Sequence, residues 1–127
     1  MNVFIGNTTQ GSTGTQTFLT PGVTTIKILR ITMGSQGTLP AADTIPHFSY
    51  GVSHDIGGTI KQYAHSVLGS GISRTSNVYA ISHYDSPSGV LRRAVSASLV
   101  SFGVGQFTLN FDRADGTYPI IIEAIGD

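Results

Sequence analysis

The sequence has no cysteine and no tryptophan, and it contains few charged residues. Without cysteine it can form neither a disulfide framework nor a thiolate metal site, so packing or partner proteins must stabilise the fold. Charged residues make up 11% of the chain, against about 25% in an average soluble protein. The seven basic and seven acidic side chains cancel, and a neutral chain lacks the field that attracts nucleic acid or an acidic membrane. We therefore expect neither nucleic acid nor membrane as a partner.

Long apolar runs are also absent. No segment approaches the roughly 18 apolar residues of a membrane-spanning helix. The N-terminal "MNVFIGNTTQ" lacks the basic and apolar regions of a signal peptide. We expect a protein made in the cytoplasm without a signal peptide. At 127 residues, the chain is long enough for one domain with one core.

The composition favours strands. Glycine, serine and threonine are abundant, and they favour turns and extended polar strands over helices. Apolar residues alternate with polar ones in about eight or nine short segments separated by turn signals. Helix is the competing interpretation for "VLRRAVSASLVSF" (90–102), where β-branched residues and serines favour a strand. The pattern predicts an all-β protein, an antiparallel β-sandwich or jelly roll.

Turn and loop signals divide these segments. Pro21-Gly22 and "DIGG" predict tight turns, and "DRADGT" predicts a hairpin that joins "FTLNFD" to "YPIII". We expect loops at 34–46, at "GSGISRTSN" (69–77) and at "DSPSG" (85–89). Residues 6–16 contain no apolar residue and predict a loose loop or an arm. We expect residues 1–16 to form an arm or edge segment that anchors on a neighbouring subunit, and residues 17–127 to form the sandwich domain.

Signals for catalysis or for a cofactor are weak. No G-x-S-x-G motif marks a nucleophilic serine, and the carboxylates are scattered among turns. The four histidines are not paired at metal-ligand spacing. The segment "DRADG" lacks the alternating ligands of a calcium loop. We expect no enzymatic activity, no cofactor and no metal site.

The closing strand "YPIIIEAI" is apolar on both sides. Alternation puts Ile120 and Ile122 on one face and Ile121 and Ile125 on the other. A small sandwich has one interior, so the second face requires a subunit interface or a covering element of the same chain. As interface residues we predict Val3, Phe4, Ile5, Tyr118, Ile121, Ile122 and Ile125, with Arg92 and Arg93 as further partner contacts.

Three segments in order carry a family resemblance: "TFLTPGVTTIKILRI", "FSYGVSHDIGGTIKQY" and "ASLVSFGVGQFTLNFDRADGTYPIIIEAIG". The strongest part comprises Phe102, Gly105, Phe107, Thr108, Leu109 and Asn110. Together they resemble small virion-associated β-domains of tailed bacteriophages.

The resemblance implies a structural role on the surface of the head or tail. It predicts a capsid-decorating or cementing protein that contacts itself and the major capsid protein or other virion proteins. By analogy with other virus-surface sandwiches we favour a homotrimer, with a dimer as the alternative. The alternative function is a glycan-binding β-sandwich module of a tail or fibre.

Overall fold

The computed structural model describes residues 1–9, 12–34, 47–69, 71–85, 90–116 and 118–127. These form ten strands in two antiparallel sheets, so the predicted all-β sandwich is confirmed, with slightly more strands than expected. No helix occurs in this part of the chain, and hence none long and apolar enough to cross a membrane. The strands are β1 (Asn2–Thr9), β2 (Gly14–Leu19), β3 (Ile26–Met33), β4 (His47–Ile56), β5 (Thr59–Leu68), β6 (Ser73–Ser76), β7 (Ile81–Asp85), β8 (Arg92–Gly103), β9 (Gln106–Ala114) and β10 (Pro119–Gly126).

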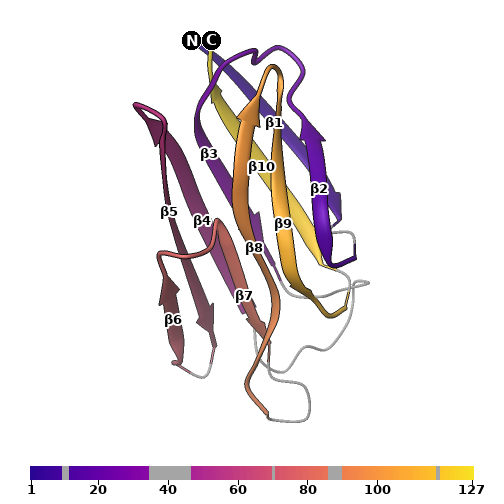
Figure 1. The fold of residues 1–127 in the computed structure, drawn as a ribbon. Coiled ribbons are helices and arrows are strands. Elements are labelled where there is room, and N and C mark those ends of the chain that lie inside the picture. Colours follow the sequence, from indigo (N-terminus) through magenta and orange to yellow (C-terminus); the bar gives the residue numbers. More distant parts are fainter. Residues whose placement is uncertain (10–11, 35–46, 70, 86–89, 117) are drawn as a thin grey trace.

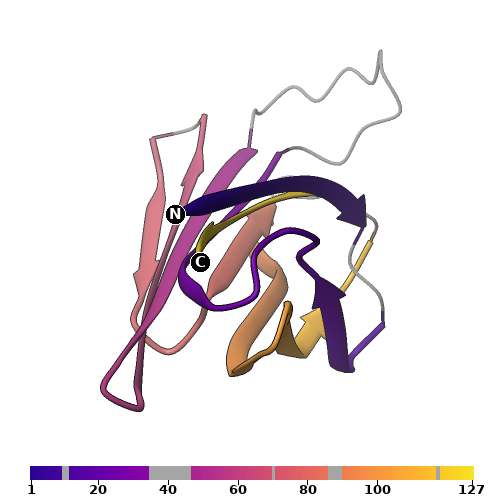
Figure 2. The ribbon, with the colours of Figure 1, turned by 90° about the horizontal axis from the view of Figure 1, so that it is seen from above.

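The two sheets differ in width (Figures 1 and 2). The wider sheet has the strand order β1-β10-β3-β4-β5-β6, and the narrower one has the order β2-β9-β8-β7. Apolar side chains from both sheets fill the space between them. Within this core Phe18 stacks on Phe107 with ring centroids 5.1 Å apart, and Phe111 lies 6.5 Å from Phe18. Burying each such side chain contributes roughly 1.5–3 kcal/mol, so this core is the main source of stability in a chain without disulfides.

The N-terminal segment forms a strand at the edge of the wider sheet. Strand β1 pairs with β10 along its whole length, from Asn2 opposite Gly126 to Thr9 opposite Pro119. The expected loose loop is therefore wrong for residues 6–9 and 14–16, which lie in β1 and β2. Residues 10 and 11 lie outside the described residues. Strand β2 crosses the boundary that we predicted after residue 16.

Most of the expected strands and one hairpin are confirmed. Segment 90–102 contributes strand β8 and no helix. The "DIGG" turn joins β4 to β5 through Gly57 and Gly58, whose φ angles of 62° and 83° suit glycine. The loop expected at 69–77 is wrong in part, because Ser73–Ser76 forms β6 and pairs with β5. The loop at 34–46 and the turn at 85–89 fall almost entirely outside the described residues.

The hairpin expected at "DRADGT" is wrong. Strand β9 pairs with β2 and β8, whereas β10 pairs with β1 and β3 in the other sheet. Both edges of β9 are occupied, so the chain must cross to the opposite layer after Ala114. Gly116 has a φ of 85°, so the left-handed residue that we expected is present in a crossover turn.

Replacing Gly116 by valine should lower the free energy of unfolding by about 1 kcal/mol or more, because a β-branched residue is strained at positive φ. Urea denaturation measures the change. The matched control is Gly34→Val, since Gly34 has no positive φ and no atom of the described residues lies within 4 Å of an added Cβ. Equal midpoints for the two variants would contradict this role of Gly116.

Candidate functional site

The face of the wider sheet that points away from the narrower sheet, here named the outer face, is the candidate interaction surface. Strand β10 shows how the two sides differ. Ile120, Ile122 and Ala124 are buried in the core, whereas Ile121 is half exposed on the other side. The strand is apolar on both sides because one side meets the core and the other forms part of the outer face.

Strand register fixes which side chains share the outer face, because directly opposed residues point to the same side of a sheet. Three rows run across it. They are Asn7–Ile121–Thr32–Tyr50–His65–Thr75, then Ile5–Glu123–Arg30–Val52–Tyr63, and then Val3–Ile125–Ile28–His54–Lys61. A further pair, Phe48 and Val67, extends the face beside the first row.

Large apolar side chains gather on this face. Eight exposed ones among the described residues lie here: Val3, Ile5, Phe48, Tyr50, Ile56, Tyr63, Val67 and Ile121. The solvent side of an antiparallel sheet is normally polar, and an extended apolar patch on a soluble domain marks an interaction site. The outer face is therefore a candidate interaction surface.

An ion pair lies in the middle of the outer face. The Arg30 guanidinium donates to the Glu123 carboxylate at 2.6 Å, in the row between Ile5 and Val52. The pair separates an apolar area on β1 and β10 from a second one on β4 and β5. Because its two charges cancel, the centre of the face has no net charge to repel a partner.

The opposite face of the molecule carries mainly polar groups, although Leu19 and Val100 are exposed apolar side chains there. On the narrower sheet the hydroxyls of Thr17 and Thr108 are 2.9 Å apart. The Asp112 carboxylate accepts hydrogen bonds from Ser96 and, at 2.8 Å, from Tyr79. Burial would raise the pKa of Asp112, but these hydrogen bonds outweigh it and hold the pKa below its usual value. This face is suited to water, so the two sides of the sandwich differ in kind.

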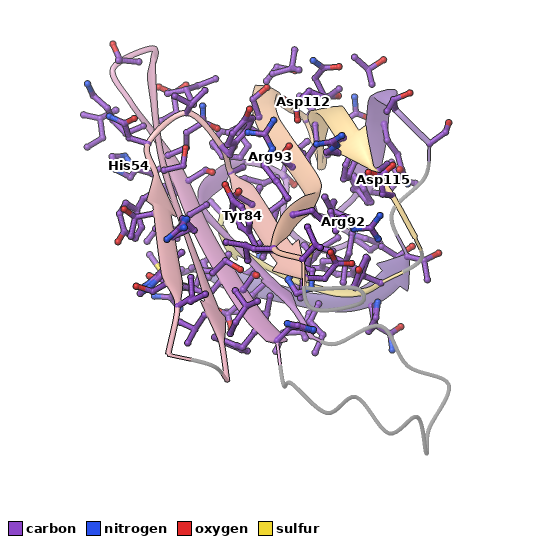
Figure 3. The ribbon with its side chains drawn as sticks, turned by 90° about the horizontal axis from the view of Figure 1, so that it is seen from below. His54, Tyr84, Arg92, Arg93, Asp112 and Asp115 are labelled. Atoms are coloured by element: carbon purple, nitrogen blue, oxygen red, sulfur yellow. The ribbon has the colours of Figure 1, made fainter. Side chains whose placement is uncertain are left out.

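The arginines that we predicted as partner contacts are engaged within the chain. Arg92 donates to both oxygens of Asp85, at 2.7 and 3.0 Å. Arg93 lies beside Asp112, at 3.8 Å (Figure 3), and its guanidinium lies 5.0 Å from the centre of the Tyr79 ring. Arg113 pairs with Asp115 at 3.2 Å. These cations therefore do not form a free basic patch.

The predicted interface residues fall into two groups. Val3, Ile5, Ile121 and Ile125 share the outer face. Phe4 turns inward and packs against the core. Tyr118 and Ile122 are buried in that core, so their assignment to a subunit interface is wrong. Alternation explains the difference for Ile122, since neighbouring residues of one strand cannot both face a partner.

No family model, curated protein or solved structure matches the chain.

A chain of polar groups runs from the exposed Arg92 to the buried Asp85 and Tyr118. The Tyr118 hydroxyl donates to Asp85 at 2.5 Å, and Asp85 also receives the two hydrogen bonds from Arg92. Burial, together with the bond to Asp85, raises the pKa of Tyr118. Burial would raise the pKa of Asp85, but the bonds from Arg92 and Tyr118 hold it below its usual value. The arrangement fixes the first residues after the crossover turn.

His83 lies against this chain. Its ring meets the Tyr118 ring edge-on, with the two ring centroids 4.7 Å apart. Its Nδ1 lies 2.5 Å from the Ser49 hydroxyl oxygen. The Ser49 hydroxyl is 2.7 Å from that of Ser66, which also accepts the Tyr84 amide hydrogen. Burial, with a smaller contribution from nearby His47, lowers the pKa of His83 to about 4. The imidazole is therefore neutral at physiological pH.

This cluster has no distinct sequence signature, because its members come from β4, β5 and β7. The hydroxyls of Ser49 and Ser66 are buried, so neither is placed to meet a substrate. No group of three His, Asp or Glu side chains that could hold a metal forms among the described residues. The arrangement is suited to joining the two sheets.

Proposed function

We propose that this protein is a non-enzymatic structural subunit that docks onto an assembly through its outer face. The observation that carries the proposal is the gathering of large exposed apolar side chains on one face of the wider sheet, opposite a mainly polar face. A monomer working free in solution gains nothing from such a surface and is at risk of aggregation.

The size of the face is adequate for a stable contact. Six strands spaced about 4.8 Å apart and eight residues rising about 3.3 Å each give a surface of about 750 Å². A standard protein interface buries about 800 Å² on each partner. Covering the outer face would thus bury an area typical of a specific complex.

The assembly that we propose is the virion of a tailed bacteriophage, where the chain decorates or cements the particle. The sequence resemblance to virion-associated β-domains supports this choice. The major capsid protein or another virion protein is the partner of the outer face. Contacts between copies, in a trimer or a dimer, add to the attachment.

The test is incorporation into particles purified from cells that produce them, measured by mass spectrometry of the particle proteins. Ile121→Asp should reduce incorporation at least tenfold, because it places an unpaired charge in an apolar contact. The matched control is Val100→Asp in the narrower sheet. Ile121 is 50% exposed and Val100 is 49% exposed, so the two changes cost the isolated domain similar amounts.

The control should keep wild-type incorporation, and both variants should keep the circular dichroism of a β protein. The proposal is wrong if the wild-type chain is absent from the particles. It is also wrong if Ile121→Asp and Val100→Asp are incorporated equally well.

A glycan-binding module is the second candidate. A hollow of about 110 Å³ lies on the wider sheet, lined by Val52, His54, Lys61, Gln62 and Tyr63. An aromatic ring beside polar groups is a plausible platform for a sugar, although the exposed aromatics are spread over strands and do not converge in a concave loop cluster. Oligosaccharide binding that Tyr63→Ala abolishes, with incorporation unchanged, would favour this candidate.

A further inference from the structure

Strand β1 is an unprotected edge. One side of it pairs with β10 over eight residues, and within the described part of the chain no strand pairs along its other side. Its sequence, "NVFIGNTT", contains neither a charged residue nor a proline. Natural sheets normally protect their edges with charges, prolines, bulges or short strands, and β1 has none of these.

The opposite edge of the same sheet is protected. Strand β6 has only four residues, and one of them is the exposed Arg74. At the edge of the narrower sheet, β2 begins at Gly14 with a φ of 109°, which departs from an extended strand. Among these edges β1 is the one that offers a long template for an added strand.

We propose that β1 pairs antiparallel with β1 of a second copy, so that two wider sheets join into one sheet of twelve strands. A two-fold axis normal to the sheet keeps each side chain on its own face. The axis must therefore lie midway between one residue of β1 and the same residue of the second copy. With the axis at Ile5, Ile5 faces its own copy, Val3 faces Asn7, and Phe4 faces Gly6. No charge opposes a like charge in this register.

The side chains at this edge fit such a pairing. The Phe4 ring lies over Gly6 of its own strand, where an added Cβ would be 2.6 Å from the ring. In this register the residue that faces Phe4 across the axis is Gly6 of the second copy. Glycine has no side chain, so it leaves room for the ring. Beside the axis a hollow of about 340 Å³, lined by Ile5, Gly6, Asn7 and Ile121, can receive a side chain from the second copy.

A second copy fits better than a foreign strand because each copy contributes the same free edge, β1, and the two edges complement each other in this register. Two-fold closure then covers both edges and leaves no free β1 for further addition. This inference rests on the free edge of β1. Ile5 and Ile121 also belong to the outer face, but the pairing does not require another protein to cover that face, so the inference does not depend on the proposed function. Pairing would also place two outer faces side by side on one continuous sheet.

The experiment compares Ile5→Lys with Ile56→Lys by size-exclusion chromatography and light scattering. Ile5 is 67% exposed and Ile56 is 69% exposed, but Ile56 ends β4, away from β1. Wild-type protein and Ile56→Lys should run at twice 13.3 kDa. Ile5→Lys should run as a monomer, since two lysines would face each other at the axis.

Hydrogen exchange provides a second measurement that needs no variant. The amide protection of β1 should increase with protein concentration, whereas that of β6 should not change. A wild-type protein that remains at 13.3 kDa at about 100 μM, well above typical dissociation constants of specific dimers, would overturn the inference. A trimer mass, or Ile5→Lys that dimerises like wild type, would do the same.

The two proposals fail separately. A dimer that is not incorporated into particles contradicts the proposed function and leaves the β1 pairing intact. A monomer that is incorporated through its outer face contradicts the pairing alone.

Discussion

Gly51→Ala should lower the free energy of unfolding by about 3 kcal/mol or more, a large part of the stability of a domain of this size. Gly51 lies in β4, between β3 and β5 of the wider sheet, and it faces Ala80, which comes just before β7 of the narrower sheet. An added Cβ would be 1.6 Å from the backbone oxygen of Ala80. The Ala80 amide is fixed by its hydrogen bond to Ala97, at 2.8 Å, so neither backbone can move away easily.

Urea denaturation at neutral pH measures this loss. Gly34→Ala is the matched control, because at that position an added Cβ meets no atom of the described residues within 4 Å. The control should have wild-type stability or slightly more, since alanine restricts the unfolded chain. A Gly51→Ala variant within 0.5 kcal/mol of the control, on the order of an ordinary surface substitution, would show that the contact is not rigid.

Acidification should remove about 3 kcal/mol of stability through His83. Its pKa falls from 6.5 to about 4 in the folded chain because burial disfavours the imidazolium. Between these two values the unfolded chain binds a proton that the folded chain does not. The stability is therefore fully present above pH 6.5 and is lost as the pH falls towards 4.

The measurement is the free energy of unfolding at a series of pH values through this window. His83→Asn should be less stable at neutral pH but should lose most of the slope, because asparagine does not titrate and can still bond to Ser49. Asp85 contributes in a more acidic window, since its pKa lies below its usual value. An unchanged slope in His83→Asn would show that another group controls the pH dependence.

Local signals were enough to predict most of the strands. Alternation located the strands now seen as β3, β4, β5 and β9, and the paired glycines of "DIGG" located the β4–β5 hairpin. The doubly apolar pattern of β10 predicted an apolar environment on each side, and the structure shows the core on one of them. Which side faces the core depends on the partner sheet, so alternation alone could not assign Ile122 to the core.

The parts that sequence could not predict depend on long-range pairing. A crossover turn and a hairpin turn place the same demand on Gly116, so the local sequence cannot tell them apart. Strand β6 is polar and short, and it becomes a strand because β5 offers a free edge. The contact between Ser49 and His83 joins β4 to β7 across the sandwich, and no spacing in the sequence marks it.

The position of β10 determines when the wider sheet can form during synthesis. Because β10 lies between β1 and β3, strand β1 has no partner in the sheet until β10 has left the ribosome. Strands β3, β4 and β5 are consecutive antiparallel neighbours, so they can pair as soon as they emerge. Strand β1 must wait, with both edges open, while β2 to β9 are made. On crowded polysomes, β1 strands of neighbouring nascent chains could therefore meet before either chain has folded.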